Sequence, residues 1–375
     1  MTPRERFRET LLFGKPDKVP FDPGHAREST LKAWHEQGLP EGRDYIDVLH
    51  ETLGIEKPKT KPVVHHGVSD KMMPMFEEKV LEHKDGHYIV QDWMGAITEI
   101  SDEYDYTYIR QAIDFVTRKW HKFPVENRED WEKMKWRFDA KTPGRFSEDF
   151  ADRCDQLRER DYVSTLTFNG PFWQLREWCG MEGLCIFMAT DPDFVMEMVD
   201  FWKDYLSDIL TIAFDGFVPD SVLINEDMAY KAHSMISPAM TRKFLLPSYK
   251  QWADQIESAG CPVFEVDSDG FIGELIPIWI DAGFNSCLPI EVAAHNDIVE
   301  FRKTFGKKMA YRGGIDKRAM AKGGEVVEKE MMRVIPPLLK DGGFIPSCDH
   351  GVPPDISWPN FIEYSRRLAQ LTGWL

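Results

Sequence analysis

The sequence predicts an α/β protein, built as a (β/α)8 barrel with an N-terminal elaboration. From residue 161 onward, short β-rich runs alternate with amphipathic stretches, which is the pattern of a parallel sheet with helical crossovers. A chain of 375 residues is long enough for one such barrel with insertions. No G-x-G-x-x-G motif follows any of the runs, which disfavours a dinucleotide-binding fold and leaves an open doubly wound sheet as the second choice.

The first expected element is a short helix that ends near Leu12. Thr2-Pro3-Arg4-Glu5 has the pattern of a capping box with proline in the first turn. Gly14-Lys15-Pro16-Asp17 ends this helix, and an extended segment that begins at Val19 leads to Asp22 and His25.

Residues 26–160 are expected to form an elaboration over one end of the barrel. Helices are predicted at residues 28–37, 44–53, 128–137 and 146–160. The segment 77–109 alternates in a way that suggests strands, including Tyr88-Ile89-Val90 and residues 96–100. Eight barrel strands are reached when residues 19–22 and 88–100 are counted among them.

The second half supplies six β-rich runs and the helices between them. Apolar residues of the stretch 193–213 fall on one stripe, as a helix packed on a core requires. Ser237-Pro238 caps a later helix, which Gly260 ends. The predicted strands are residues 162–168, 221–225, 262–266, 285–289, 308–312 and 343–346.

Composition excludes several classes of partner. The net charge of -17 repels phosphate backbones and anionic lipids, so nucleic-acid and membrane binding are not expected. The six cysteines show no C-x-x-C spacing and are interpreted as reduced thiols. No secretory signal or apolar run of membrane-spanning length is present in the sequence, and we expect a cytoplasmic protein.

Charged residues follow the predicted strands at their carboxyl ends, where the active site of a parallel barrel lies. We expect Glu226, Asp267, Asp269 and His350 to be catalytic. The residues expected to contact substrate are His25, Trp93, Asn169, Phe172, Trp173, Asp227, Glu291, Arg312 and Lys317.

Several carboxylates in one barrel mouth are costly unless a cation neutralises them, and a divalent metal is the simplest such cation. Asp267, Asp269 and His350 are the predicted ligands, because carboxylate and imidazole donors suit Zn, Mn, Fe or Mg. Other readings stay open. The Asp267–Gly270 stretch could be a helix cap and turn, and Glu226-Asp227 could pair with Arg312 or Lys317. His350 could be structural.

The chain resembles the uroporphyrinogen decarboxylase superfamily, which includes corrinoid-dependent methyltransferases. The likeness spans nearly the whole chain and is weak between residues 40 and 160. It implies a distorted (β/α)8 barrel. The motifs that carry it are Thr2–Arg6, Lys15–Pro20, Asn169-Gly170-Pro171-Phe172, Met235–Pro238 and Asp349–Pro354.

Two departures narrow what the resemblance implies. The decarboxylases carry an M-R-Q-A-G-R-Y motif whose two arginines hold propionates, whereas this chain has Phe21–Arg27, with an aspartate and without the arginine pair. The methyltransferases bind zinc through His-x-Cys and a later Cys. The matching positions here are Asp267, Asp269 and His350, so the thiolate ligands are absent and thiol substrates are in doubt.

The resulting hypothesis is an enzyme that moves a methyl group from a small methoxylated or methylated-amine substrate to a corrinoid. A divalent metal, expected to be zinc, would assist the transfer, and the resemblance implies a partner protein that carries the corrinoid (cobalamin) and a homodimer. Phe172, Trp173 and Trp93 would form an apolar wall, and Arg312 and Lys317 would orient a carboxylate. A metal-free lyase or decarboxylase and a non-catalytic ligand-binding barrel are the alternatives.

Overall fold

The computed structural model of the protein describes residues 1–107 and 117–375. Contacts within the chain divide it into two units that alternate along the sequence. The first unit comprises residues 1–66, 152–168 and 217–375, and the second comprises residues 67–151 and 169–216. Within the described ranges, no helix has both the length and the apolar character needed to cross a bilayer.

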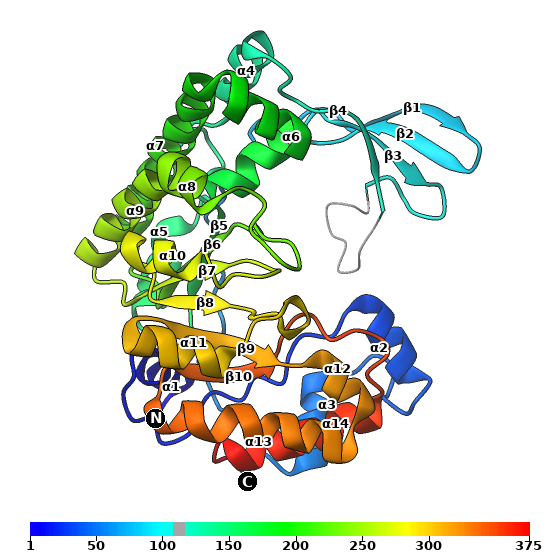
Figure 1. The fold of residues 1–375 in the computed structure, drawn as a ribbon, viewed down its shortest axis with the longest axis vertical. Coiled ribbons are helices and arrows are strands. Elements are labelled where there is room, and N and C mark those ends of the chain that lie inside the picture. The colour runs from blue at the N-terminus through cyan, green and yellow to red at the C-terminus, as the bar shows by residue number, and fades with distance from the viewer. Residues whose placement is uncertain (108–116) are drawn as a thin grey trace. The chain divides into compact units, whose positions relative to one another are not determined.

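The first unit contains the six-stranded sheet of the protein (Figure 1). Its strands are β5 (Thr165–Asn169, ending at the start of the second unit), β6 (Ser221–Asn225), β7 (Val263–Asp267), β8 (Ser286–Leu288), β9 (Ala310–Ile315) and β10 (Phe344–Cys348). Its α-helices are α1 (Pro3–Leu11), α2 (Glu28–His35), α3 (Tyr45–Leu53), α5 (Phe150–Arg158), α8 (Pro238–Met240), α9 (Leu246–Ser258), α10 (Ile276–Ala282), α11 (Ile298–Phe305), α12 (Lys317–Lys322), α13 (Gly324–Asp341) and α14 (Trp358–Leu371). A π-helical turn, η3 (Thr241–Leu245), and the 3-10 turns η4 (Val292–Ala294) and η5 (Gly306–Lys308) complete the unit.

The strands follow the order β10-β9-β8-β7-β6-β5, and neighbouring strands from β6 to β10 are parallel. Asp267 at the end of β7 lies opposite Asn225 on β6 and Leu288 on β8. Cys348 at the end of β10 lies opposite Ile315 on β9. The carboxyl ends of these strands therefore form one edge of the sheet, and the residues that follow them gather along it.

Helix α13 illustrates how the sheet is covered. Val327, Met331, Val334 and Leu338 recur every three or four residues and are buried, and the helix packs against β9, β10 and α14 (Figure 1). Burial of each such side chain contributes about 1.5–3 kcal/mol to folding. The apolar stripe on α13 therefore fixes the helix on the sheet.

The segment before α2 lies against the end of β10. The backbone N–H of Val352 donates to the His25 carbonyl at 2.8 Å, and the N–H of Arg27 donates to the Val352 carbonyl at 3.3 Å. Gly24 has a φ of +109°, and a Cβ built on it would lie 2.9 Å from the Cβ of Cys348. Glycine is thus required both by the backbone conformation and by the close approach. This contact places His25 and Arg27 at the carboxyl edge.

The second unit has its own sheet and helices. The sheet is antiparallel, with the order β1-β2-β3-β4, and α6 packs against α7. The elements are β1 (Lys79–Lys84), β2 (His87–Gln91), β3 (Ile97–Ser101), β4 (Lys119–Lys122), α4 (Arg128–Met134), the 3-10 turn η2 (Lys135–Arg137), α6 (Pro171–Thr190) and α7 (Pro192–Gly216).

Aromatic side chains form the core of the second unit. Trp178 on α6 lies against Trp131, Phe138 and Trp202, with ring centroids 5.0, 5.3 and 5.6 Å apart. Phe138 also contacts Tyr205 in an edge-on arrangement at 5.6 Å. Such pairs contribute about 0.5–1.5 kcal/mol beyond the burial of their area. The cluster fixes α4, α6 and α7 together.

Most predicted elements are confirmed to within a few residues. The capping box at Thr2, the helices α2–α5 and α7, and the strands β5–β10 are all present. The assignment of residues 88–100 to the barrel is wrong, because they pair in the separate antiparallel sheet. Residues 19–22 form no strand. Residues 108 and 109, at the end of the predicted strand region, lie outside the described residues.

Candidate active site

The candidate active site consists of charged side chains that follow β6 to β10. The backbone N–H groups of Glu226 and Asp227 donate to the Asp267 carbonyl at 2.9 and 3.2 Å, which joins the loop after β6 to the end of β7. Asp227 has a φ of +38°, in the left-handed region that L-residues seldom occupy. Backbone strain of this kind is concentrated at functional sites.

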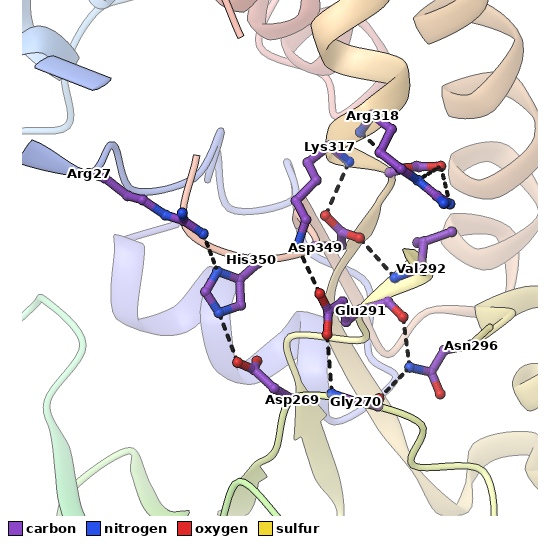
Figure 2. Close-up of polar contacts among 11 residues, drawn as sticks. Arg27, Asp269, Gly270, Glu291, Val292, Asn296, Lys317, Arg318, Asp349 and His350 are labelled. Carbon is purple, nitrogen blue, oxygen red and sulfur yellow. Dashed lines mark hydrogen bonds and ion pairs between the residues drawn. The ribbon is translucent and has the colours of Figure 1, made fainter. Parts of the chain in front are cut away.

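His350 and Asp269 form the central pair of the site (Figure 2). The Nε2 atom of His350 lies 2.9 Å from Oδ2 of Asp269, and Nδ1 lies 3.2 Å from Nη2 of Arg27. A guanidinium can only donate, so in this arrangement Nδ1 accepts and the ring proton is on Nε2, where it points to Asp269. The Asp269 hydrogen bond raises the pKa of His350, while burial, Lys317 and Arg27 oppose the charged form.

Asp267, the last residue of β7, holds a proton at higher pH than an ordinary aspartate. Burial, followed by the nearby carboxylates of Asp269 and Asp227, raises its pKa to about 7, although His350 and Arg312 act in the opposite direction. A carboxyl group with a pKa near the working pH can both give and take a proton, as a general acid or base must.

Asp349 joins the loops after β8 and β9 to the end of β10. Its Oδ2 accepts from the N–H of Val292 at 2.8 Å, and its Oδ1 accepts from the N–H of Lys317 at 3.1 Å. Lys317 Nζ in turn lies 2.9 Å from Glu291, whose other oxygen accepts from Gly270 N–H at 3.2 Å (Figure 2). Burial raises the pKa of Asp349 to about 6. The network holds three loops in one arrangement.

Two further predicted residues, Arg312 and Glu226, form an ion pair and a hydrogen bond inside the first unit. Arg312, within β9, lies 3.4 Å from the carboxylate of the fully buried Glu265, which also accepts from Ser286 at 3.0 Å. Glu226 is buried and accepts a hydrogen bond from the Tyr249 hydroxyl on α9. The side chain of His25 is exposed.

The remaining predicted residues belong to the second unit. Phe172 is fully buried in α6, and the Nε1 of Trp173 donates to Glu177 at 2.9 Å. Trp93 and Asn169 line a common small cavity, which Glu177 also lines.

Sequence reasoning missed Arg27, Asp349 and Glu177 as site residues. Asp349 precedes the predicted His350 directly, and its position after a strand was a usable signal. Glu177 lies one helical turn after Trp173, on the same face of α6. Arg27 carried no comparable signal, because its contact with His350 joins residues 323 positions apart.

The fit of these side chains to a metal ion can be tested on their geometry. Among the described residues, no group of three or more His, Cys, Asp or Glu side chains is placed to hold a metal ion. Nε2 of His350 is directed at Asp269, and burial raises the pKa of the Cys348 thiol to about 12, so this thiol is protonated at neutral pH. Ligation of a metal ion by Asp267, Asp269 and His350 stays a prediction.

Comparison with known proteins identifies relatives of this chain. Residues 122–364 match the family model for uroporphyrinogen decarboxylase (URO-D). A comparison of the sequence with curated proteins finds no match. Among solved structures, a methyltransferase from Methanosarcina mazei aligns with a TM-score of 0.59 and 13% identity, over 98% of each chain. The family and this structural likeness confirm the predicted (β/α)8-barrel fold class.

Proposed function

This chain belongs to the uroporphyrinogen decarboxylase (URO-D) family, and we propose that it transfers a methyl group from a small methoxylated or methylated-amine compound to a corrinoid carried by a partner protein. One observation carries this proposal. At the carboxyl edge of the sheet, His350 is hydrogen-bonded to Asp269, and both interact electrostatically with Asp267. Three proton-handling groups from two strand ends therefore act on one another.

The chemistry required is proton delivery to a departing oxygen. When methyl leaves a methoxy group, the bonding electron pair stays on the oxygen, and the resulting alkoxide or phenolate is neutralised by a proton. Asp267 holds such a proton near neutral pH, so it is placed to act as the general acid. The reduced corrinoid supplies, when bound, the electron pair that accepts the methyl group.

The other charged residues fix the groups around His350. Asp269 and Arg27 contact opposite nitrogens of His350 and thereby fix the ring and its tautomer. Asp349 fixes the backbone of Lys317 and Val292 by accepting a hydrogen bond from each N–H group. A methoxylated substrate benefits most from the site, because an alkoxide is a much more basic leaving group than a neutral amine.

Overall charge supports a substrate of low negative charge. A chain with a net charge of -17 and several carboxyl groups at the site repels a polycarboxylate such as a porphyrinogen. Each close contact between like charges costs about 1–4 kcal/mol at effective protein dielectrics. The structural similarity to the methyltransferase from Methanosarcina mazei also favours methyl transfer over porphyrinogen decarboxylation in this proposal.

Methyl transfer can be tested directly with purified protein. The protein is incubated with a reduced corrinoid and with each member of a panel of small methoxylated and methylated-amine compounds. We expect stoichiometric formation of methylated corrinoid and demethylated product, both detected by mass spectrometry. The matched variant Asp267→Asn keeps the size of the side chain and removes its proton, so we expect the rate to fall by about 10²- to 10⁴-fold.

The controls separate methyl transfer from the other activities considered. Lys303→Gln removes an exposed ion pair with Glu300 on α11 and should leave the rate unchanged. Release of carbon dioxide from a small carboxylate, without loss of any methyl group, would instead identify a decarboxylase. Tight ligand binding without turnover in wild type would identify a binding protein.

A further inference from the structure

The second unit contains a small cavity with aromatic walls. Its volume is about 50 Å³, which corresponds to roughly three to five water positions or one compact ligand. The rings of Trp93, Phe138 and Trp178 contribute to its lining, and Phe138 and Trp178 stand at an interplanar angle of 61°. Adjacent rings at a steep angle form two sides of a box rather than a flat stack.

One carboxyl group in this lining, that of Glu177, accepts hydrogen bonds from neutral donors. The Nε1 of Trp173 donates to it at 2.9 Å, and the side-chain amides of Asn169 and Gln174 donate to it at 3.4 Å each. Burial raises the pKa of Glu177, which means that its charged form is poorly solvated. A cation bound beside this carboxyl group would restore the lost solvation.

The residues that line the cavity carry unequal numbers of acidic and basic groups. Asp70 and Lys71 also line it, so that with Glu177 the lining contains two carboxyl groups and one ammonium group. Arg176 and Lys71 lower the pKa of Glu177 electrostatically. The Arg176 guanidinium lies over the ring of Trp173 at 4.9 Å, and Lys71 is exposed. Arg118 also interacts electrostatically with Glu177, but neither Arg118 nor Arg176 lines the cavity. For the lining residues alone, one monovalent cation balances the charge when both carboxyl groups are ionised.

We propose that this cavity binds a small methylated ammonium ion. The methyl groups pack on the faces of Trp93, Phe138 and Trp178, and the positive charge lies beside Glu177. Aromatic faces attract cations, and a methylated ammonium suits such a box because it carries its charge on an apolar surface. A primary ammonium or a metal ion is more strongly hydrated and would lose more on entering a cavity in which rings and methionines make up half of the lining residues.

This binding site stands apart from the proposed function. It lies entirely among residues of the second unit, and occupancy of the cavity does not require that the ligand be demethylated. A binding measurement therefore tests the cavity, while the turnover assay tests methyl transfer, and failure of one leaves the other intact.

The experiment is calorimetric titration of the full-length protein with tetramethylammonium chloride, compared with tert-butanol. The two compounds have nearly the same shape and differ in charge. We expect tetramethylammonium to bind at least about tenfold more tightly than tert-butanol. Glu177→Gln should weaken it by about tenfold or more, because the amide keeps the Trp173 hydrogen bond while removing the negative charge. Trp93→Leu should weaken it similarly.

Lys71→Gln is the matched control on the same cavity. It removes a positive charge, so tetramethylammonium should bind as well as in wild type or more tightly. Circular dichroism checks that each variant is folded. If Glu177→Gln does not fold, the affinity of Trp93→Leu for tetramethylammonium still tests the proposal. Absence of binding by wild type, equal affinity for tert-butanol, or unchanged affinity in folded Glu177→Gln and Trp93→Leu would overturn the proposal.

Discussion

The two units of this protein surround their carboxyl groups in different ways. In the first unit, Asp269 and Glu291 at the sheet edge contact an imidazole and an ammonium, and Glu265 within β7 contacts a guanidinium. In the second unit, Glu177 receives its hydrogen bonds from an indole and two amides. A carboxylate paired within the protein can hold geometry and pass protons, whereas one surrounded by neutral donors and rings is suited to receive a charged ligand.

Loss of the His350 imidazole should have the largest effect on catalysis. A small effect would contradict the role given to the sheet edge in the comparison. His350→Gln removes the ring that connects Asp269 to Arg27, and with it one proton-carrying group of the edge. We expect kcat for methyl transfer to fall by about 10²-fold or more. Steady-state kinetics at several substrate concentrations separate this fall from a change in KM. A wild-type kcat in the folded variant would remove His350 from the mechanism.

The paired carboxylate inside the sheet gives the next largest effect. Glu265 is fully buried, and Glu265→Gln removes the carboxylate that forms an ion pair with the Arg312 guanidinium. Arg312 then retains its electrostatic interactions with Asp22 and Asp267. Breaking a buried ion pair on one side costs about 3–5 kcal/mol, and the partial exposure of Arg312 places the expected loss near the lower end. Urea denaturation measures the free energy of unfolding. A change smaller than that of the surface variant Lys303→Gln would contradict the role given to this pair.

Glu177→Gln should have the smallest effect on stability, and in the opposite direction. The amide is cheaper to bury than a carboxylate, so the free energy of unfolding should stay the same or rise by about 1 kcal/mol. The raised pKa of Glu177 means that the folded state binds this proton more tightly than the unfolded state. Its contribution to stability is therefore greatest at low pH and is lost as pH rises through the folded pKa.

In Glu177→Gln that pH dependence should be reduced. The free energy of unfolding of wild type and variant is measured by urea denaturation at pH 5 and at pH 8. A variant that is several kcal/mol less stable than wild type at pH 8 would show that Glu177 is an ion-pair partner, and the contrast between the two units would fail.

The positions of the strands that form the sheet edge could be predicted from the sequence, whereas most contacts between side chains there could not. The alternation of β-rich and amphipathic segments predicted the positions of β5 to β10. Asp267, Asp269 and His350 were then predicted as site residues, because parallel strands bring their carboxyl ends together. Pairing partners could not be predicted in the same way. Residues 88–100 alternate like any half-buried strand, and alternation alone does not reveal which sheet a strand joins.

Long-range contacts explain the remaining omissions. Arg27 meets His350 only because Gly24 lets the preceding segment approach Cys348, which is a tertiary packing effect. The aromatic residues of α6 can be recognised in the sequence as candidates for substrate contact. The burial of the Glu177 carboxyl group cannot, because it depends on neighbours from other segments.

The central claim is that Asp267 keeps its proton close to neutral pH, and this can be measured without any substrate. Infrared difference spectroscopy between pH 6 and pH 8 detects carboxyl groups that lose a proton in that range. We expect a transition centred near pH 7 that disappears in Asp267→Asn and persists in Asp349→Asn. Asp349, whose carboxyl group has a pKa of about 6, contributes a separate signal at lower pH, and that signal is the one lost in Asp349→Asn. A spectrum without a carboxyl transition between these pH values, or one that Asp267→Asn leaves unchanged, would contradict the account.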